Sequence, residues 1–190
     1  MMRHCLRRGF TLVELLAVLA IGASLLAIAL PDLQALLRAQ QLRAASSDLF
    51  EAIGLARAQA IARNTRIRLG PRDPAGSDWT KGWTVFADRD EDGAAGPGDD
   101  IIAVHGPLAP GLAFDMAFNG PAPPYYIAYN GAGRSCSATS SAAARPGTLS
   151  LFHGGAVRRI KINMLGRARM CNPARDDHCE GADAPSDAPP

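Results

Sequence analysis

Apolar and polar positions divide the chain into three stretches with different patterns. Residues 10–30 form one apolar run in which Glu14 is the only ionisable side chain, and a run of that length can span the hydrocarbon core of a bilayer as a helix. From residue 31 to residue 64, apolar residues recur at helical spacing with arginines on other faces. After residue 64, short apolar segments alternate with turns rich in glycine and proline. The pattern predicts a long helix followed by a β-rich region.

We expect the two helical stretches to form one helix from Phe10 to about Asn64, on the order of 80 Å long at 1.5 Å per residue. Pro31 should kink this helix rather than end it, because residues 33–63 contain no proline and a single glycine. The second half is expected to pack on a head domain through the apolar positions Leu42, Ala45, Leu49, Ile53, Ala56 and Ala60.

The remaining chain contains eight segments with the length and composition of strands. They are Thr65–Leu69, Trp83–Ala87, Ile101–His105, Leu112–Phe114, Tyr125–Tyr129, Thr148–Phe152, Arg158–Asn163 and Arg167–Cys171. Short strands separated by turns predict an antiparallel sheet or sandwich. The fold class is therefore α+β, with a long N-terminal helix, membrane-spanning in its first half, packed on an antiparallel β-rich head.

The charges around the apolar run predict its orientation in a membrane. Three arginines precede the run, and no cation follows it until Arg38, so the N-terminus should be cytoplasmic and the rest exported. The alternative is a cleavable secretory signal, since "AIA" at residues 27–29 has the form of a cleavage site. However, the run is longer than a usual signal, and Glu14 would cost about 2–3 kcal/mol near the middle of a span.

The stretch "GFTLVELL" at residues 9–16 resembles the N-terminal signal of type IV pilins and type II secretion pseudopilins. In that family a prepilin peptidase cleaves after the glycine, here Gly9, and the new first residue, here Phe10, is N-methylated. The family's glutamate at the fifth mature position falls on Glu14. The resemblance implies that Glu14 pairs with the α-amine of a neighbouring subunit in the filament, which would explain a charge inside an apolar span.

The segment "SDWTKGWTVFADRDEDGAAGPGDDII" resembles the GspH/FimT branch of pseudopilins and minor pilins. This resemblance and the composition divide the chain into a prepilin leader (1–9), a transmembrane and filament-core helix (10–30), its amphipathic continuation (31–64), a GspH/FimT-like β-rich periplasmic head (65–172) and an acidic, proline-rich tail expected to be disordered (173–190).

The resemblance implies a structural subunit of a secretion pseudopilus or a pilus, with no cofactor. Its expected partners are other pseudopilins or pilins, the prepilin peptidase, an inner-membrane assembly platform and membrane lipid. Before assembly it should be a single-pass protein of the inner membrane with a periplasmic head. We do not expect an enzyme, because His105, His153 and His178 have no companion motif, and the sequence contains no Gly-x-Ser-x-Gly, phosphate-loop or His-Glu-x-x-His motif.

An acidic loop follows the Trp-containing segment. Asp88, Asp90, Asp92, Gly93 and Asp99 occupy positions 1, 3, 5, 6 and 12 of a calcium-loop template. The last position is usually a bidentate glutamate, and a helix rather than a strand usually precedes such a loop. We therefore expect no metal here but a solvated hairpin tip whose charge discourages edge-to-edge pairing, with calcium as the weaker alternative.

Residues 134–175 hold eight cations and no acid, and they contain a Gly-Arg-x-Arg pattern at residues 166–169. The same pattern occurs in FimT-type minor pilins, some of which bind DNA during natural transformation. Arg167 and Arg169 would share one face of a strand, and Arg158 would add to it, so a DNA receptor is the alternative function. No aromatic residues are interleaved with these cations, so only weak, salt-sensitive binding is expected.

Four cysteines are present, and Cys5 lies in the leader. Because the head should be exported, we expect one disulfide. We favour Cys136–Cys171, with Cys171–Cys179 as the alternative. The group Cys171, His178 and Cys179 is at most a weak metal candidate.

Overall fold

A computed structural model of the chain describes residues 11–118 and 123–182, except for the side chains of residues 28, 29 and 31. The predicted cleavage and methylation positions, Gly9 and Phe10, lie outside the described residues. The chain divides into two compact units, residues 1–38 and residues 39–190. The first half of the long helix therefore belongs to one unit, and its second half belongs to the head.

Helix α1 runs from Leu12 to Arg63, which corresponds to about 78 Å at 1.5 Å per residue. It continues through Pro31, as predicted. At its start, the backbone N–H of Glu14 donates to Oγ1 of Thr11 at 3.2 Å, so Thr11 acts as the N-cap. At its end, Asn64 adopts a left-handed conformation with φ of 49°, a common way for a helix to terminate.

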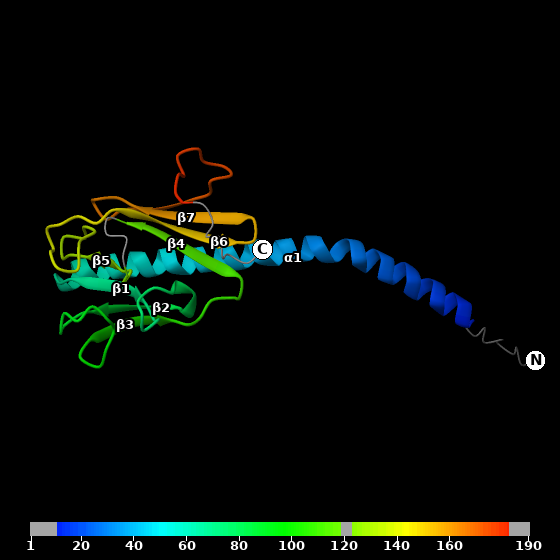
Figure 1. Ribbon diagram of the computed structural model, residues 1–190, viewed down its shortest axis with the longest axis horizontal. Coiled ribbons are helices and arrows are strands. Elements are labelled where there is room, and N and C mark those ends of the chain that lie inside the picture. Colours follow the sequence, from blue (N-terminus) through cyan, green and yellow to red (C-terminus); the bar gives the residue numbers. More distant parts are fainter. Residues whose placement is uncertain (1–10, 119–122, 183–190) are drawn as a thin grey trace, which may run out of the picture. The chain divides into compact units, whose positions relative to one another are not determined.

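The head contains two antiparallel four-stranded sheets (Figure 1). The first has the strand order β3-β2-β1-β5, with β1 at Ile67–Pro71, β2 at Trp83–Ala87, β3 at Asp100–His105 and β5 at Ile127–Tyr129. The second has the order β4-β6-β7-β8, with β4 at Leu112–Phe118, β6 at Gly147–His153, β7 at Ala156–Ile162 and β8 at Ala168–Cys171. A short 3₁₀ helix, η1, covers Trp79–Lys81.

The second half of α1 lies between the two sheets in the view of Figure 1. Its apolar stripe, predicted from the sequence, is buried, and Leu49, Ala56 and Ala60 are completely inaccessible to solvent. These side chains join buried residues of both sheets in one hydrophobic cluster, with Val85 from the first sheet and Leu149 from the second. The sequence-based fold class, α+β with an antiparallel head, is thus confirmed.

All eight predicted strands are present; β2 has the predicted bounds, and the other seven have shifted boundaries. The largest difference is at β4, which continues to Phe118 because every residue from Leu112 to Phe118 pairs with β6. The predicted fifth strand is shortened to Ile127–Tyr129, the three residues that pair with β1.

The cysteine pairing differs from the favoured prediction. Cys171 is bonded to Cys179, eight residues further on, with the two Cα atoms 5.8 Å apart, whereas Cys136 is free and buried. The backbone of Cys136 bonds to Ala128 of β5 in the first sheet, while Cys171 ends β8 in the second. The prediction of a Cys136–Cys171 bond is therefore wrong, and the disulfide occupies both sulfurs of the weak metal candidate. Burial raises the pKa of the Cys136 thiol, which lowers its reactivity.

The segment after β8 is also more structured than predicted. Cys179 is buried, and the guanidinium of Arg159 donates hydrogen bonds to the backbone carbonyls of Cys179, Gly181 and Ala182. The prediction of a disordered tail from residue 173 is therefore wrong for residues 173–182, because backbone carbonyls in this segment accept hydrogen bonds from the buried Arg159. Residues 183–190 lie outside the described part.

Replacing Cys171 and Cys179 by serine should lower the free energy of unfolding by about 2–3 kcal/mol, since a disulfide closing a loop of this length restricts the unfolded chain. Denaturant unfolding of the chain with and without reductant measures the effect. The control is Cys136→Ala, in which reductant should still lower the free energy of unfolding by the same amount. If Cys136→Ala abolished that effect of reductant, the pairing described here would be incorrect.

Candidate functional site

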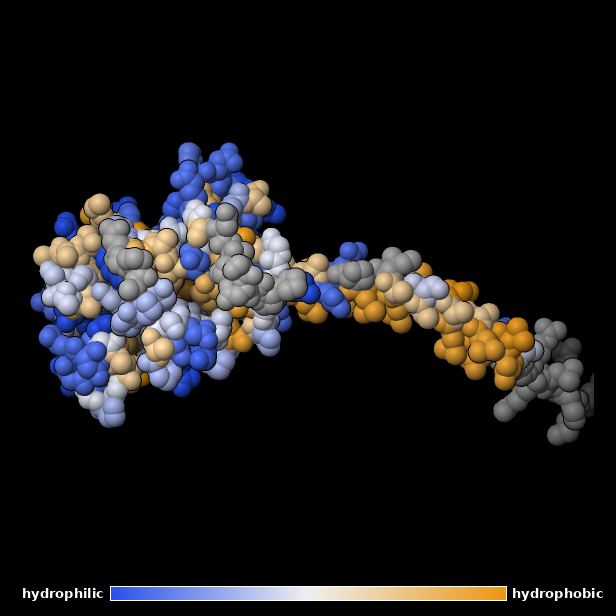
Figure 2. Space-filling view, viewed as in Figure 1, coloured by the Kyte–Doolittle hydropathy of each residue, from blue (hydrophilic) through white to orange (hydrophobic). Residues whose placement is uncertain are grey.

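The first half of α1 presents mostly apolar side chains on the face drawn in Figure 2. Thirteen large apolar side chains of this segment are each more than half exposed, namely Leu12, Val13, Leu15, Leu16, Val18, Leu19, Ile21, Leu25, Leu26, Leu30, Leu33, Leu36 and Leu37. Soluble proteins rarely expose contiguous apolar surface on this scale, and such surfaces mark membrane or protein contacts.

The length and composition of α1 can be compared with what a membrane span requires. Within the described residues, no single helix is by itself long and apolar enough to cross, whereas Leu12–Ala27 and Asp32–Arg63 together meet that requirement across a bend at residues 28–31. The bend coincides with Pro31, where the sequence predicts a kink. Length and composition therefore agree with the predicted span.

Glu14 is an exposed residue of the first helical turn. Its backbone N–H is bonded to the Thr11 hydroxyl, so the two residues occupy the Ncap and N3 positions of the helix, with the Thr-x-x-Glu spacing of a capping box. A carboxylate at this position also interacts favourably with the helix dipole. The sequence interpretation missed this local role, although the Thr-x-x-Glu spacing indicates it. The start of α1 is therefore compatible with a carboxylate at position 14.

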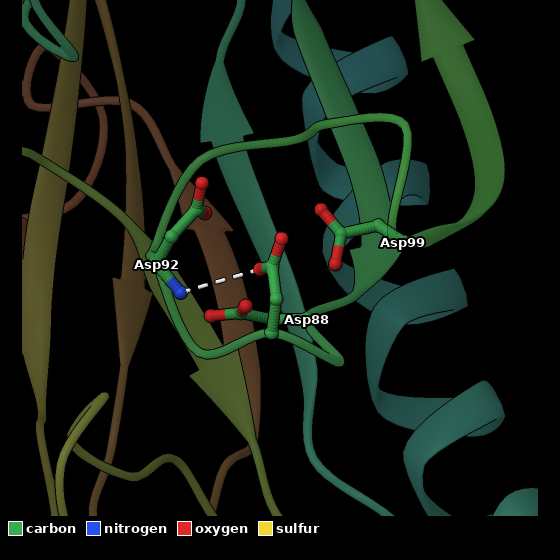
Figure 3. A group of neighbouring side chains, drawn as sticks. Asp88, Asp92 and Asp99 are labelled. Carbon is green, nitrogen blue, oxygen red and sulfur yellow. Dashed lines mark hydrogen bonds between the residues drawn. The ribbon is translucent and has the colours of Figure 1, made fainter.

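The acidic loop joins β2 to β3, and its four aspartates converge. One carboxylate oxygen from each of Asp88, Asp90, Asp92 and Asp99 lies within 4.8 Å of the others. Figure 3 shows Asp88, Asp92 and Asp99 around the inside of this loop. Backbone amides support the arrangement, since Asp99 accepts hydrogen bonds from the N–H groups of Arg89 and Gly96 at 2.9 and 2.8 Å. The structure thus brings together all four residues of the calcium alternative.

Three arginines, at the end of α1, in the connection to β1 and on β1, pair with acids of the same hairpin. Arg63 pairs with Asp100, Arg66 with Glu91 and Arg68 with Asp88. The Arg68–Asp88 pair is buried, with side chains 4% and 1% exposed. These contacts attach the hairpin to the rest of the head.

The basic residues of the second sheet do not form the predicted common face. Arg169 is directly opposite Lys161 in the β7–β8 ladder, so Arg169 shares its face with Lys161 and not with Arg158, because side chains alternate along a strand. Arg158 lies on the same face of β7 as the buried Ile160. Burial, followed by the charges of Arg43 and Arg175, lowers the pKa of the Arg158 guanidinium. The prediction that Arg158 extends the face of Arg167 and Arg169 is wrong.

The segment after β8 covers part of this basic face. Arg169 forms an ion pair with Asp176 at 2.7 Å, and Lys161 donates to the backbone carbonyl of His178. The backbone N–H of His178, together with Arg169, lowers the pKa of Asp176. Arg167 remains exposed. This geometry does not favour a DNA-binding role, because Arg169 is already paired with an acid of the same chain.

The histidines of the two sheets have structural partners. His105 stacks on Trp83 with ring centroids 4.1 Å apart, and its Nε2 atom lies 3.3 Å from Asp48. His153 contacts Gln41 at 2.7 Å. These contacts connect the helix to both sheets within the head.

Comparison with known proteins agrees with this architecture. The family model of the type II transport protein GspH matches residues 45–166, and the prokaryotic N-terminal methylation motif matches residues 6–30. Comparison with curated proteins finds no matching sequence.

Two solved structures resemble the chain in fold. The type IV minor pilin FimU of Pseudomonas aeruginosa is 16% identical, with a TM-score of 0.52, and the match covers 71% of this chain and 91% of FimU. The minor pseudopilin EpsH of the Vibrio cholerae type 2 secretion system is 18% identical, with a TM-score of 0.50 and coverage of 70% and 98%. The match to the family model over residues 45–166 shows that this chain belongs to the GspH family of type II transport proteins.

Proposed function

We propose that this chain is processed at Gly9 and assembled as a minor subunit of a type II secretion pseudopilus or a type IV pilus. The observation that carries the proposal is the exposed apolar surface of residues 12–37 on an otherwise well-packed protein. Membership of the GspH family and the methylation motif at residues 6–30 support the same role.

In this proposal the first half of α1 is held in two successive apolar environments. Before assembly, residues 10–30 span the inner membrane, with the N-terminus in the cytoplasm and the head in the periplasm. There the prepilin peptidase removes the leader and Phe10 is methylated. The helix then leaves the lipid through the assembly platform and packs among the helices of other subunits. Both environments exclude water from the same apolar side chains.

Glu14 sets the position of the subunit within the fibre. A charge inside an apolar span is costly unless it is paired, and the α-amine of a neighbouring subunit's Phe10 is the cation that assembly brings to this depth. Leaving one partner of a buried pair uncompensated costs about 3–5 kcal/mol, so a subunit inserted at another height would be strongly disfavoured.

The head presents the rest of the subunit to the periplasm. Its closed core requires no partner for stability, since both sheets and α1 bury their apolar side chains in one cluster. The proposal assigns it no cofactor and a structural rather than a catalytic role. We do not propose a DNA-receptor function, because Arg158 and Arg169 do not form a free common face with Arg167.

Mass spectrometry of the purified mature chain should find N-methylated Phe10 at its N-terminus when the chain is co-expressed with a prepilin peptidase. The Gly9→Ala variant is the control, because a changed cleavage position should leave the leader in place. A mature N-terminus at Leu30 would instead identify an ordinary signal peptide and contradict the proposal.

Replacing Glu14 by glutamine should reduce incorporation into fibres at least about tenfold. Breaking the buried ion pair is expected to cost about 3–5 kcal/mol of assembly free energy, and about 1.4 kcal/mol is enough for a tenfold change. Glutamine can preserve the capping box, so membrane insertion and helicity should be unchanged. The measurement is the amount of the chain in sheared fibres relative to the membrane fraction.

The matched control for this variant is Thr11→Ala. It removes the helix cap, worth about 1 kcal/mol, but keeps the carboxylate, and it should assemble nearly as the wild type does. Normal assembly of Thr11→Ala would show that assembly does not depend on the cap, and normal assembly of Glu14→Gln would refute the proposed pairing.

A further inference from the structure

The acidic loop between β2 and β3 has a geometry that fibre assembly does not require. We propose that residues 88–99 bind one Ca²⁺ ion through the carboxylates of Asp88, Asp90, Asp92 and Asp99. This assignment reverses our sequence-based preference for a merely solvated hairpin tip. It is independent of the proposed role of Glu14, which lies in the other unit of the chain.

The distances fit a single calcium ion. Calcium binds oxygen at about 2.3–2.6 Å, so two oxygens on opposite sides of one ion are at most about 5 Å apart. The four carboxylate oxygens lie within 4.8 Å of one another, and one ion can therefore contact all of them. A hairpin tip that only repels other sheet edges would have its acids directed outward, whereas these converge (Figure 3).

The burial of Asp88 provides a second observation. Its side chain is 1% exposed, and one of its oxygens, Oδ2, pairs with Arg68. The other oxygen, Oδ1, is buried and has no hydrogen-bond partner among the described residues. A buried carboxylate oxygen without a partner is unfavourable, and a cation held by the loop would satisfy it.

The charge balance of the loop points the same way. The neighbouring arginines are engaged with Asp88, Glu91 and Asp100. Within the described part of the chain, no lysine or arginine forms an ion pair with Asp90, Asp92 or Asp99. Like charges at these separations repel one another, and a bound divalent cation would remove that repulsion.

The order of the ligands also agrees with a calcium loop. Gly93 occupies the sixth position of the template, where a sharp turn is needed, and its φ of 90° is in the region that favours glycine. Asp99 occupies the twelfth position, where its shorter side chain replaces the usual bidentate glutamate. Fewer ligand oxygens weaken binding, so we expect a dissociation constant on the order of 10⁻⁴–10⁻³ M, as in extracellular calcium modules.

Isothermal titration calorimetry of the full chain in non-ionic detergent tests the proposal. CaCl₂ is titrated into chelator-treated, dialysed protein, and one ion per chain should bind. Asp92→Asn should weaken binding at least about tenfold, because ligand charge sets affinity in such sites. Asp92 is exposed, so the variant should fold normally; Asp90→Asn provides a second, equally exposed ligand change.

Glu91→Gln is the matched control. It removes one negative charge from the same loop, but Glu91 is directed to Arg66 rather than into the cluster, so binding should change less than about twofold. No saturable binding up to about 10 mM Ca²⁺, ten times the weakest expected constant, would overturn the proposal. So would equal weakening by Glu91→Gln and Asp92→Asn, or equal affinity for Mg²⁺, which requires a smaller octahedral site.

Discussion

An ionised carboxylate inside hydrocarbon needs a partner, and the organisation of this chain follows from that constraint. Glu14 lies at the start of a helix whose next 16 residues, up to Leu30, include no ionisable side chain. The next cation along the helix, Arg38, is about 36 Å away at 1.5 Å per residue. Among the described residues, the backbone N–H of Glu14 donates a hydrogen bond to the Thr11 hydroxyl. In our account the compensating charge comes from another copy or another member of the fibre, and this dependence makes the segment an assembly element.

Helix α1 belongs to both units, and the exposure of its apolar side chains differs between them. Up to Leu37 its large apolar side chains are exposed, whereas from Leu42 onward a stripe of apolar side chains is buried in the head. One helix can have both surfaces because the two parts differ in sequence. A helix that packs on sheets needs only one apolar stripe, whereas a helix that spans a bilayer is apolar on all sides. The two units are thereby joined by continuous helix, without a separate linker segment.

Regular structure was predictable here, and tertiary pairing was not. The apolar run, the stripe through Leu49 and the eight strands follow from periodicity, which is a local property. The disulfide was misassigned because spacing does not reveal that Cys136 joins β5 and Cys171 ends β8. Arg158 was misplaced because its face depends on the β7–β8 register. The four aspartates were recognised as a pattern, but their convergence and the buried Oδ1 atom of Asp88 required coordinates.

The most direct test of the central claim is a cryo-electron microscopy map of an assembled fibre containing this subunit. We expect the Glu14 carboxylate to lie within about 4 Å of the α-amine of an adjacent subunit, the usual limit for an ion pair. A well-resolved fibre in which that carboxylate faces water, or in which the nearest amino terminus lies at another height along the axis, would contradict the account.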